Sequence, residues 1–170
     1  GGQFGWSRRI PGKREFGETL RYFTRMLDKH GVEVRLGCHA GLDLLLGYDE
    51  VVLATGVVPR VPDIPGIDHP MVLSYADALA GEPVGERVAV VGAGGIGFDV
   101  SEFLTTDHSP TLDLKQWRAE WGALPPHEAP QVRGSLTTPL PGAATRRVYL
   151  LQRTKGPQGR GLGKPTGWVH

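Results

Sequence analysis

The sequence predicts an α/β fold in which helices cover a parallel β-sheet. Residues 87–91 are a short apolar run of the kind that a parallel sheet buries on both faces, and residues 147–151 predict a further strand. The first run leads directly into a glycine-rich turn, and the residues after that turn show the apolar pattern of a helix. This strand–turn–helix order, followed by a second strand, is typical of a βαβ unit. We therefore expect a Rossmann-like module with a parallel sheet.

The first third of the chain predicts a helix followed by two strands. Residues 13–30 carry an apolar stripe at helical spacing and end before Gly31, a residue suited to the position after a helix. The stripe consists of Phe16, Leu20, Phe23 and Leu27. Residues 32–36 alternate between apolar and polar side chains, as a short strand does. Residues 48–54 end in an unbroken apolar run, which predicts a strand buried on both faces.

A proline-rich crossing separates two expected structural units. Residues 57–70 contain prolines and glycines that forbid a regular helix or a central strand: Pro59, Pro62, Pro65, Gly66 and Pro70. A short helix over residues 74–79, with Ser74 as its N-cap, follows the crossing. We expect the first unit to span residues 1–83 and the second to span residues 84–170.

The second unit is expected to contain a long insertion between its two strands. A helix from about residue 95 to residue 105 follows the first strand, and residues 106–145 are then rich in proline. Within this insertion Leu114, Trp117 and Trp121 predict one helix, whose apolar edge could pack on the main body. The strand at residues 147–151 closes the unit.

Composition and cysteine count limit the function classes. The 170 residues carry 19 basic and 18 acidic side chains, with 39% hydrophobic and 22% charged residues, which is ordinary for a folded domain. The single cysteine, Cys38, excludes an internal disulfide and a cysteine-based metal site, so no metal ligands are assigned. No stretch predicts a membrane span or a signal peptide. We expect a cytoplasmic, soluble fragment of a longer protein, with no membrane partner.

The turn after the first strand fits the pattern GxGxxG, which is typical of dinucleotide binding. Gly92 would make the tight turn, Gly94 would let the backbone approach a pyrophosphate, and Gly97 would let helix and strand pack closely. Gly95 and Ile96 begin the helix whose N-terminus would hold the negative charge. The alternative is a purely structural glycine turn, which the flanking strand and helix make less favoured.

Basic residues in the last quarter of the chain favour NADPH over NADH. Residues 129–170 hold seven basic residues and no acidic ones. Arg153 and Lys155 follow the second strand, where NAD-binding proteins place a carboxylate that grips the ribose. A cationic group there suits the 2′-phosphate of NADP, although a solvated surface charge is the alternative.

Other chemistries find little support in the residues. The segment from Gly161 to Thr166 fails the phosphate-loop pattern at Gln158 and Pro165. A nucleic-acid partner is disfavoured because aromatic residues are nearly absent from residues 152–167. The six histidines are scattered, and no nucleophile–base arrangement is legible. We therefore assign no catalytic residue to this segment.

In five places the sequence resembles the C-terminal part of bacterial-type NADPH-dependent 2,4-dienoyl-CoA reductases, of the NADH:flavin oxidoreductase or old yellow enzyme superfamily. The matching segments, in order, are Gly1-Gly2-Gln3-Phe4, Arg9-Ile10-Pro11-Gly12-Lys13, Ala54-Thr55-Gly56, Gly92 to Gly97, and Leu151-Gln152-Arg153. The resemblance runs essentially end to end. It implies an FAD domain interrupted by an NADPH domain, with a barrel carrying FMN and a 4Fe-4S cluster in the missing N-terminal part.

This resemblance implies a division of labour between the two units. Residues 1–83 would be the later portion of the FAD domain, where Gly2 and Gln3 lie beside FAD and Ala54, Thr55 and Gly56 approach the flavin. Residues 84–170 would open the NADPH domain. The segment would pass hydride from NADPH to FAD, for the reduction of an enoyl- or dienoyl-CoA double bond in the missing barrel. The isolated fragment is expected to be inactive.

Two alternatives to this function remain at the level of the sequence. One is the nucleotide-binding electron-transfer module of an amine-dehydrogenase-like enzyme, which the full GxGxxG and Arg153 argue against. The other is a non-catalytic nucleotide-binding module. Flavin absorbance that NADPH bleaches would favour the reductase over both.

Overall fold

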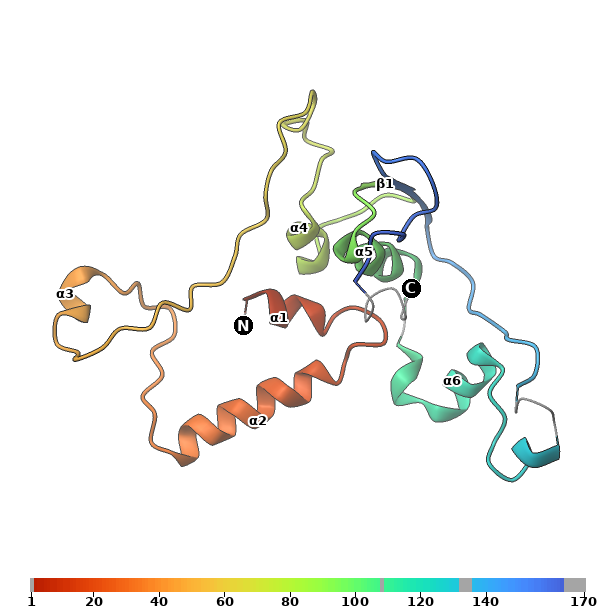
Figure 1. The fold of residues 1–170 in the computed structure, drawn as a ribbon, viewed down its shortest axis with the longest axis horizontal. Coiled ribbons are helices and arrows are strands. Elements are labelled where there is room, and N and C mark those ends of the chain that lie inside the picture. Colours follow the sequence, from red (N-terminus) through yellow and green to blue (C-terminus); the bar gives the residue numbers. More distant parts are fainter. Residues whose placement is uncertain (1, 108, 132–135, 164–170) are drawn as a thin grey trace.

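The computed structural model describes residues 2–107, 109–131 and 136–163 (Figure 1). The first elements along these residues are helices, and the last element is a strand. The elements are α1 (Gly2–Ser7), α2 (Phe16–Lys29), α3 (Leu42–Leu45), α4 (Tyr75–Ala80), β1 (Arg87–Val91), α5 (Gly95–Thr105), η1 (Pro110–Leu112), α6 (Leu114–Trp121), η2 (Ala129–Gln131) and β2 (Arg147–Leu151).

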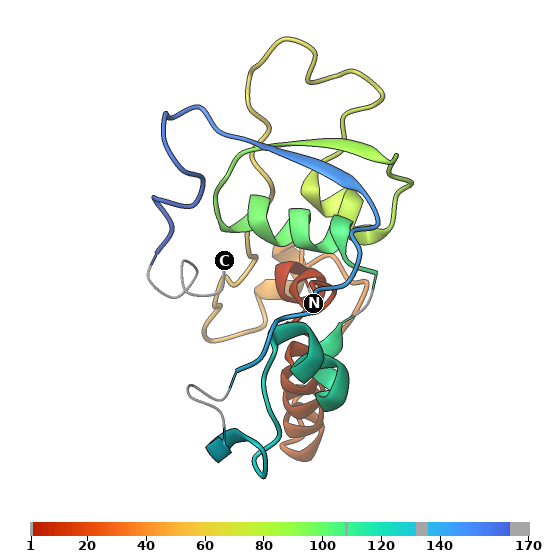
Figure 2. The ribbon, with the colours of Figure 1, turned by 90° about the vertical axis from the view of Figure 1, so that its right-hand side faces the viewer.

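The two strands form a parallel sheet, as the sequence predicts. β1 pairs with β2 in the register Arg87↔Arg147 to Val91↔Leu151. Helix α5 connects to the end of β1 and packs against both strands, and Figure 2 shows it lying along one face of the sheet. This β1–α5–β2 arrangement confirms the Rossmann-like α/β fold with a parallel sheet.

A small apolar core lies between α5, α4 and the segment that follows α1. Its buried members are Ile10, Leu79, Val100 and Leu104, and Ile10 is only 1% exposed. Half-buried side chains from both strands, including Val88 and Val148, pack against this cluster. The core therefore combines residues on both sides of the expected boundary at residues 83/84.

Several helix boundaries agree with the sequence prediction. Helix α2 begins at Phe16, a few residues later than expected, and ends before Gly31, which has a left-handed φ of 65°. Ser74 caps α4: its hydroxyl accepts from the amide of Asp77, and the Asp77 carboxylate accepts from the amide of Ser74. Helix α1 was not predicted, and its Phe4 ring stacks on Phe16 with a centroid distance of 4.9 Å.

The strands expected at residues 32–36 and 48–54 are absent from the structure. Both segments run as irregular chain, and Val52 and Leu53 are 87% and 80% exposed. A strand needs a hydrogen-bonded neighbour, and within the described residues only β1 and β2 pair. The prediction was wrong here because an apolar pattern alone cannot supply that neighbour. The chain between α2 and α4 instead extends away from the core, with α3 at its far end (Figure 1).

The expectation that the strand at residues 87–91 is buried on both faces is also wrong. Along β1 and β2 half-buried and exposed residues alternate. Val91 is 72% exposed and Leu151 is 48% exposed. The reason is that α5 covers one face of this sheet, so the side chains that point to the other face remain in solvent.

The helix expected inside the insertion is confirmed as α6. Asp113 caps it by accepting hydrogen bonds from the amides of Lys115 and Gln116. Its two tryptophans, Trp117 and Trp121, contact each other at 6.3 Å between ring centroids. The apolar edge does not pack on the main body along its length, because Leu114 and Trp121 are 59% and 61% exposed. No helix in the described ranges is long and apolar enough to cross a membrane.

Candidate dinucleotide-binding site

The glycine-rich turn joins β1 to α5 at the carboxyl end of the sheet. Gly92 follows the last residue of β1 with a φ of 121°, a conformation that favours glycine. Its amide donates a 2.8 Å hydrogen bond to the carbonyl of Leu151, the last residue of β2. Gly94 is the N-cap of α5 in extended conformation, and the helix begins at Gly95. The turn is therefore attached to both strands at the carboxyl end of the sheet.

The space around the glycines separates a structural role from a binding role. A Cβ placed on Gly97 would lie 1.8 Å from the carbonyl oxygen of Gly92, so this position has no room for a side chain. A Cβ placed on Gly94 would meet no atom within 4 Å. The fold itself therefore requires glycine at Gly97 but leaves the space in front of Gly94 open. Such an open approach to the backbone fits the pyrophosphate of a dinucleotide.

The N-terminus of α5 gives this open space its electrostatic character. The first amide groups of a helix have no partner within the helix, and the aligned peptide dipoles place partial positive charge there. Gly95 and Ile96 form the start of this helix, and the Ile96 side chain is 52% exposed. The turn thus offers backbone donors at an accessible, electropositive helix end, which is the arrangement that binds phosphate groups.

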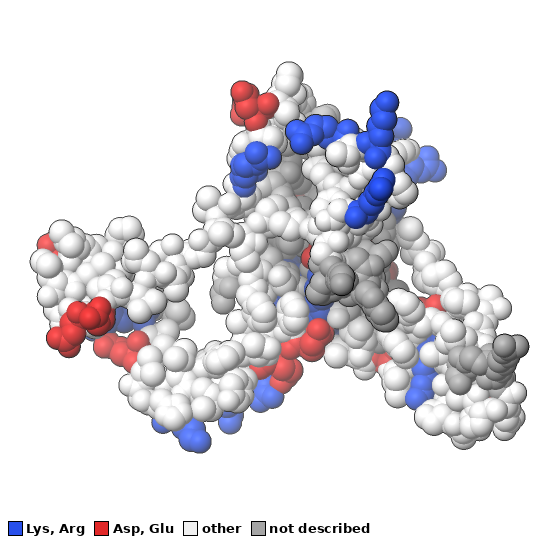
Figure 3. All heavy atoms as spheres, viewed as in Figure 1, with Lys and Arg blue, Asp and Glu red and all other residues white. Residues whose placement is uncertain are grey.

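The basic residues predicted to bind the cofactor follow β2 at the same carboxyl end of the sheet. Arg153 and Lys155 are exposed in a turn that the side chain of Gln152 closes with a 2.6 Å hydrogen bond to the carbonyl of Gly156. Because Leu151 is bonded to Gly92, this turn begins beside the glycine turn. Figure 3 shows Lys and Arg side chains gathered over this part of the molecule. Lys164 lies outside the described residues.

The chain then returns from β2 towards α5. A Cβ on Gly159 would lie 3.2 Å from the ring of Phe98, so this part of the tail packs on the helix directly after the glycine turn. Arg160, which comes next, is exposed. The segment after β2 therefore lines the surroundings of the turn with basic side chains, whereas the sequence could place only Arg153 and Lys155 there.

The residues expected beside the flavin lie on two segments that are distant in the sequence and are joined by one hydrogen bond. Gly2 and Gln3 lie on α1, while Ala54, Thr55 and Gly56 lie in the extended chain before the proline-rich crossing. The Gln3 amide nitrogen donates to the carbonyl of Val57 at 3.4 Å, which connects the two segments. It also lies 2.6 Å from the hydroxyl of Tyr75, the first residue of α4.

Tyr75 was missed at the level of the sequence, and its aromatic ring also meets Trp6 edge-on, at 6.1 Å between centroids. No periodic or motif signal marks this tyrosine as a partner of Gln3, because the contact joins residues 72 positions apart. The pairing could have been found only from the fold.

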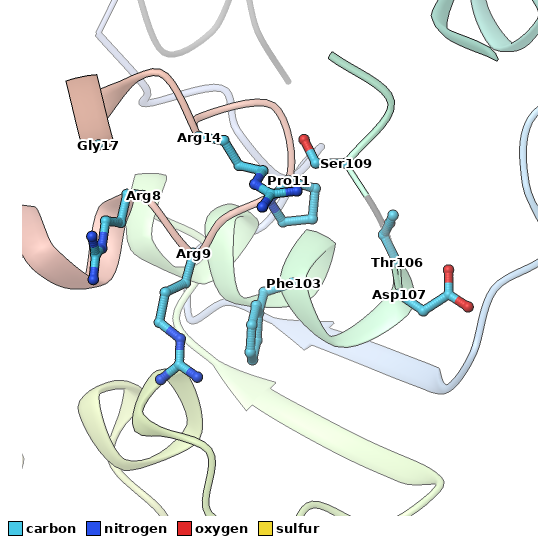
Figure 4. Close-up of a pocket in the computed structure, with 9 residues that line it drawn as sticks. All are labelled: Arg8, Arg9, Pro11, Arg14, Gly17, Phe103, Thr106, Asp107 and Ser109. Carbon is cyan, nitrogen blue, oxygen red and sulfur yellow. The ribbon is translucent and has the colours of Figure 1, made fainter. Parts of the chain in front are cut away.

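A pocket of about 450 Å³ lies where the chain after α1 crosses the end of α5 (Figure 4). Its lining includes Arg8, Arg9 and Arg14 on one side and Phe103 and Asp107 on the other. The Arg9 guanidinium donates a hydrogen bond to the carbonyl of Leu79, so this side chain is bound to α4. In Figure 4 the three guanidinium groups point in different directions and do not converge on one point. Among the described residues no group of three or more His, Cys, Asp or Glu side chains could hold a metal ion.

Comparison with known proteins places these features in a family context. Residues 23–109, just over half of the chain, match the family described as pyridine nucleotide-disulphide oxidoreductase. The metal reductase of Desulforamulus reducens (strain ATCC BAA-1160 / DSM 100696 / MI-1) is 27% identical over 99% of this chain and 25% of its own length. The cinnamate reductase of Clostridium sporogenes is 35% identical over 50% of this chain and 13% of its own length.

A solved structure shares the fold. The complex of 2-naphthoyl-CoA reductase with 2-naphthoyl-CoA aligns with a TM-score of 0.57 and 31% identity, covering 61% of this chain and 16% of that protein. The present chain thus spans a quarter or less of the length of each of these three relatives.

Proposed function

Because this chain belongs to the pyridine nucleotide-disulphide oxidoreductase family, we propose that it is the NADPH- and FAD-binding part of a larger flavoprotein reductase. Members of the family are oxidoreductases that bind FAD and NAD(P)H. When both nucleotides are bound, NADPH supplies a hydride that FAD accepts. The chain contains one cysteine, Cys38, so it holds no disulfide of its own.

One observation carries the nucleotide-binding part of this proposal, namely the contrast between Gly94 and Gly97. If the turn were only structural, each glycine would be explained by crowding or by backbone conformation. Gly97 is explained by crowding and Gly92 by its φ, but Gly94 has open space and a φ of −91°. Open space alone does not mark a site, because Gly41 is equally open. Gly94, however, lies at the N-terminus of α5 and at the carboxyl end of the sheet, where a ligand that approaches the backbone accounts for a glycine.

The choice of NADPH rests on the charge beside this turn. Arg153 and Lys155 are exposed at the end of β2, where the adenosine ribose of a bound dinucleotide lies in this fold. The planar guanidinium forks onto phosphate oxygens, whereas the ribose of NADH offers only hydroxyl groups. The acid-free sequence from residue 129 onwards supports the same assignment.

For the flavin we propose that α1 and the chain around Gly56 form one side of the binding site. The hydrogen bonds of Gln3 to Val57 and Tyr75 hold these segments together. Gly2, Ala54 and Thr55 would then contact FAD through the backbone. The side chain of Gln3 is engaged within the protein, so its role would be to position the flavin segment as well as to border it.

The acceptor of the electrons lies outside this chain, and we propose that it is an enoyl- or dienoyl-CoA thioester. The relative named for 2-naphthoyl-CoA reduces an acyl-CoA, and the relative named for cinnamate reduces an unsaturated carboxylic acid. The remaining part of the protein would carry FMN and a 4Fe-4S cluster. This chain would then contact only nucleotides, and it would supply no group to the double-bond reduction.

The decisive experiment is an anaerobic titration of the intact protein with NADPH while its flavin absorbance is recorded. We expect bleaching of the flavin by NADPH, followed by recovery of the absorbance when 2,4-dienoyl-CoA is added. Bleaching without recovery would retain the NADPH–FAD function and remove the proposed substrate. A protein that binds NADPH but contains no reducible flavin would overturn the proposal and favour a non-catalytic nucleotide-binding module.

A further inference from the structure

The segment after α1 is docked on the dinucleotide-binding unit by several independent contacts. Ile10 is the most deeply buried side chain of the core, against Val100 and Leu104 of α5. The amide of Gly12 donates a 3.1 Å hydrogen bond to the hydroxyl of Ser109, just beyond the end of that helix. Residues 9–13, hereafter the docking segment, thus contact the C-terminal half of α5 and the chain that follows it.

An ion pair completes this attachment near the glycine turn. The Lys13 ammonium lies 2.5 Å from Oδ1 of Asp99, and the two side chains are 25% and 24% exposed. Asp99 lies in the second turn of α5, so it is close in sequence to the open backbone at Gly94. By contrast, the ion pair of Arg21 with Glu18 joins two residues of α2, and its side chains are 66% and 68% exposed.

The docking segment is continuous with the helix that carries the expected flavin contacts. It begins two residues after α1 ends, and α1 contains Gly2 and Gln3. Through Arg9 it also reaches the carbonyl of Leu79 at the end of α4, the helix whose Tyr75 holds Gln3. Figure 4 shows the Arg9 side chain pointing toward α4. A continuous chain of contacts therefore leads from the segment expected to lie beside the flavin to α5.

We infer that Lys13 is a positioning residue for electron transfer, which acts by holding Asp99 and thereby the orientation of α5 relative to the flavin segment. This inference rests on the proposed function. Hydride transfer depends on the distance and angle between the two reacting rings, and a misplacement of about 1 Å can cost on the order of a hundredfold in rate. The ion pair is also a hydrogen bond, which constrains the position of both partners, and at about a quarter exposure its charges are only partly screened by water.

The inference is tested in the intact protein with Lys13→Met and Asp99→Asn. We expect the rate of flavin reduction at saturating NADPH to fall by roughly ten- to a hundredfold, with the FAD content and the dissociation constant of NADPH unchanged. The long-wavelength absorbance of NADP⁺ bound against reduced flavin should weaken, and backbone amides of α5 and the docking segment should exchange faster with solvent. Lys13→Arg, which keeps the charge, should restore most of the rate.

The matched control is Arg21→Met, which removes the exposed ion pair to Glu18 on α2 and should leave every readout unchanged. The positioning role is overturned if both test variants reduce flavin at the wild-type rate. It is also overturned if their loss follows FAD content or thermal stability alone and Lys13→Arg performs no better than Lys13→Met. If NADPH fails to reduce the wild-type flavin, the proposed function fails first, and the positioning role falls with it.

Discussion

At the residue scale, the fold constrains the three glycines of the GxGxxG motif differently. Gly92 has a backbone conformation that disfavours side chains, Gly97 has no room for a Cβ, and Gly94 has neither constraint. The sequence motif suggests a role for each glycine, but only the surrounding atoms show which glycine could be replaced without disturbing the fold. That difference makes the binding role of Gly94 separable from stability.

We predict that a substitution at Gly97 lowers stability, whereas one at Gly94 prevents reduction of the flavin by NADPH. Gly97→Ala places a methyl group against the Gly92 carbonyl and should destabilise the protein by about 1–3 kcal/mol, the scale of overpacking. Gly94→Val should leave the melting temperature nearly unchanged but abolish NADPH reduction of the flavin, with FAD retained. Thermal unfolding and NADPH titration measure the two effects, and Gly41→Ala, also in open space, serves as control. Loss of FAD with Gly94→Val would assign the turn to the flavin instead.

A second prediction at this scale concerns the choice between the two nicotinamide cofactors. Arg153→Ala should weaken NADPH binding by about 1.5–3 kcal/mol, the contribution of a charged hydrogen bond, while NADH binding stays unchanged. Added salt should weaken NADPH more than NADH. The measurement is kcat/KM for both cofactors, with Arg147→Ala at the opposite end of β2 as the matched control. An unchanged ratio of the two values would show that Arg153 is only a surface charge.

At the scale of elements, the patterns that agree with the structure are those whose partners lie within the chain. β1, β2 and α5 pack on one another, so their apolar runs correctly predicted two strands and a helix, although only one face of the strands is covered. The runs at residues 32–36 and 48–54 have similar composition but pair with nothing among the described residues, and no local signal distinguishes the two cases. The same limit applies to the site: the glycine motif is local, whereas the contacts Gln3–Tyr75 and Lys13–Asp99 join distant residues.

Helix α4 offers a test of how far a local signal contributes to the shared core. The capping box of Ser74 and Asp77 satisfies the first amides of this helix, and its Leu79 belongs to the buried cluster. Ser74→Ala should lower the free energy of unfolding by about 1 kcal/mol, because one helix amide loses its partner. Chemical denaturation measures the change. An unchanged midpoint would mean that tertiary packing alone determines where α4 begins.

At the scale of the whole molecule, the chain leaves an unusual amount of surface in water. Its accessible surface is 13910 Å² for a mass of 18.4 kDa. A compact monomer of this mass exposes about 8,200 Å² by the usual scaling of surface with mass. This surface includes large apolar side chains, because Val52, Leu53 and Val58 are each at least 80% exposed and side chains on one face of the sheet remain in solvent. Exposed apolar surface of this kind is typical of interaction sites and of segments that aggregate.

We therefore predict that these 170 residues, produced alone, are marginally stable and associate with one another. Among the described residues the core has few buried apolar side chains, namely Ile10, Ala78, Leu79, Val100 and Leu104, and such a small cluster opposes the chain entropy of the whole segment weakly. The exposed edges of the two-stranded sheet and its bare face would also invite pairing between copies. The segment should melt without a sharp transition, bind a dye specific for exposed apolar surface, and elute larger than a monomer. A cooperative transition in a monomer that binds no dye would contradict this prediction, and it would mean that residues 30–73 fold onto the core in solution.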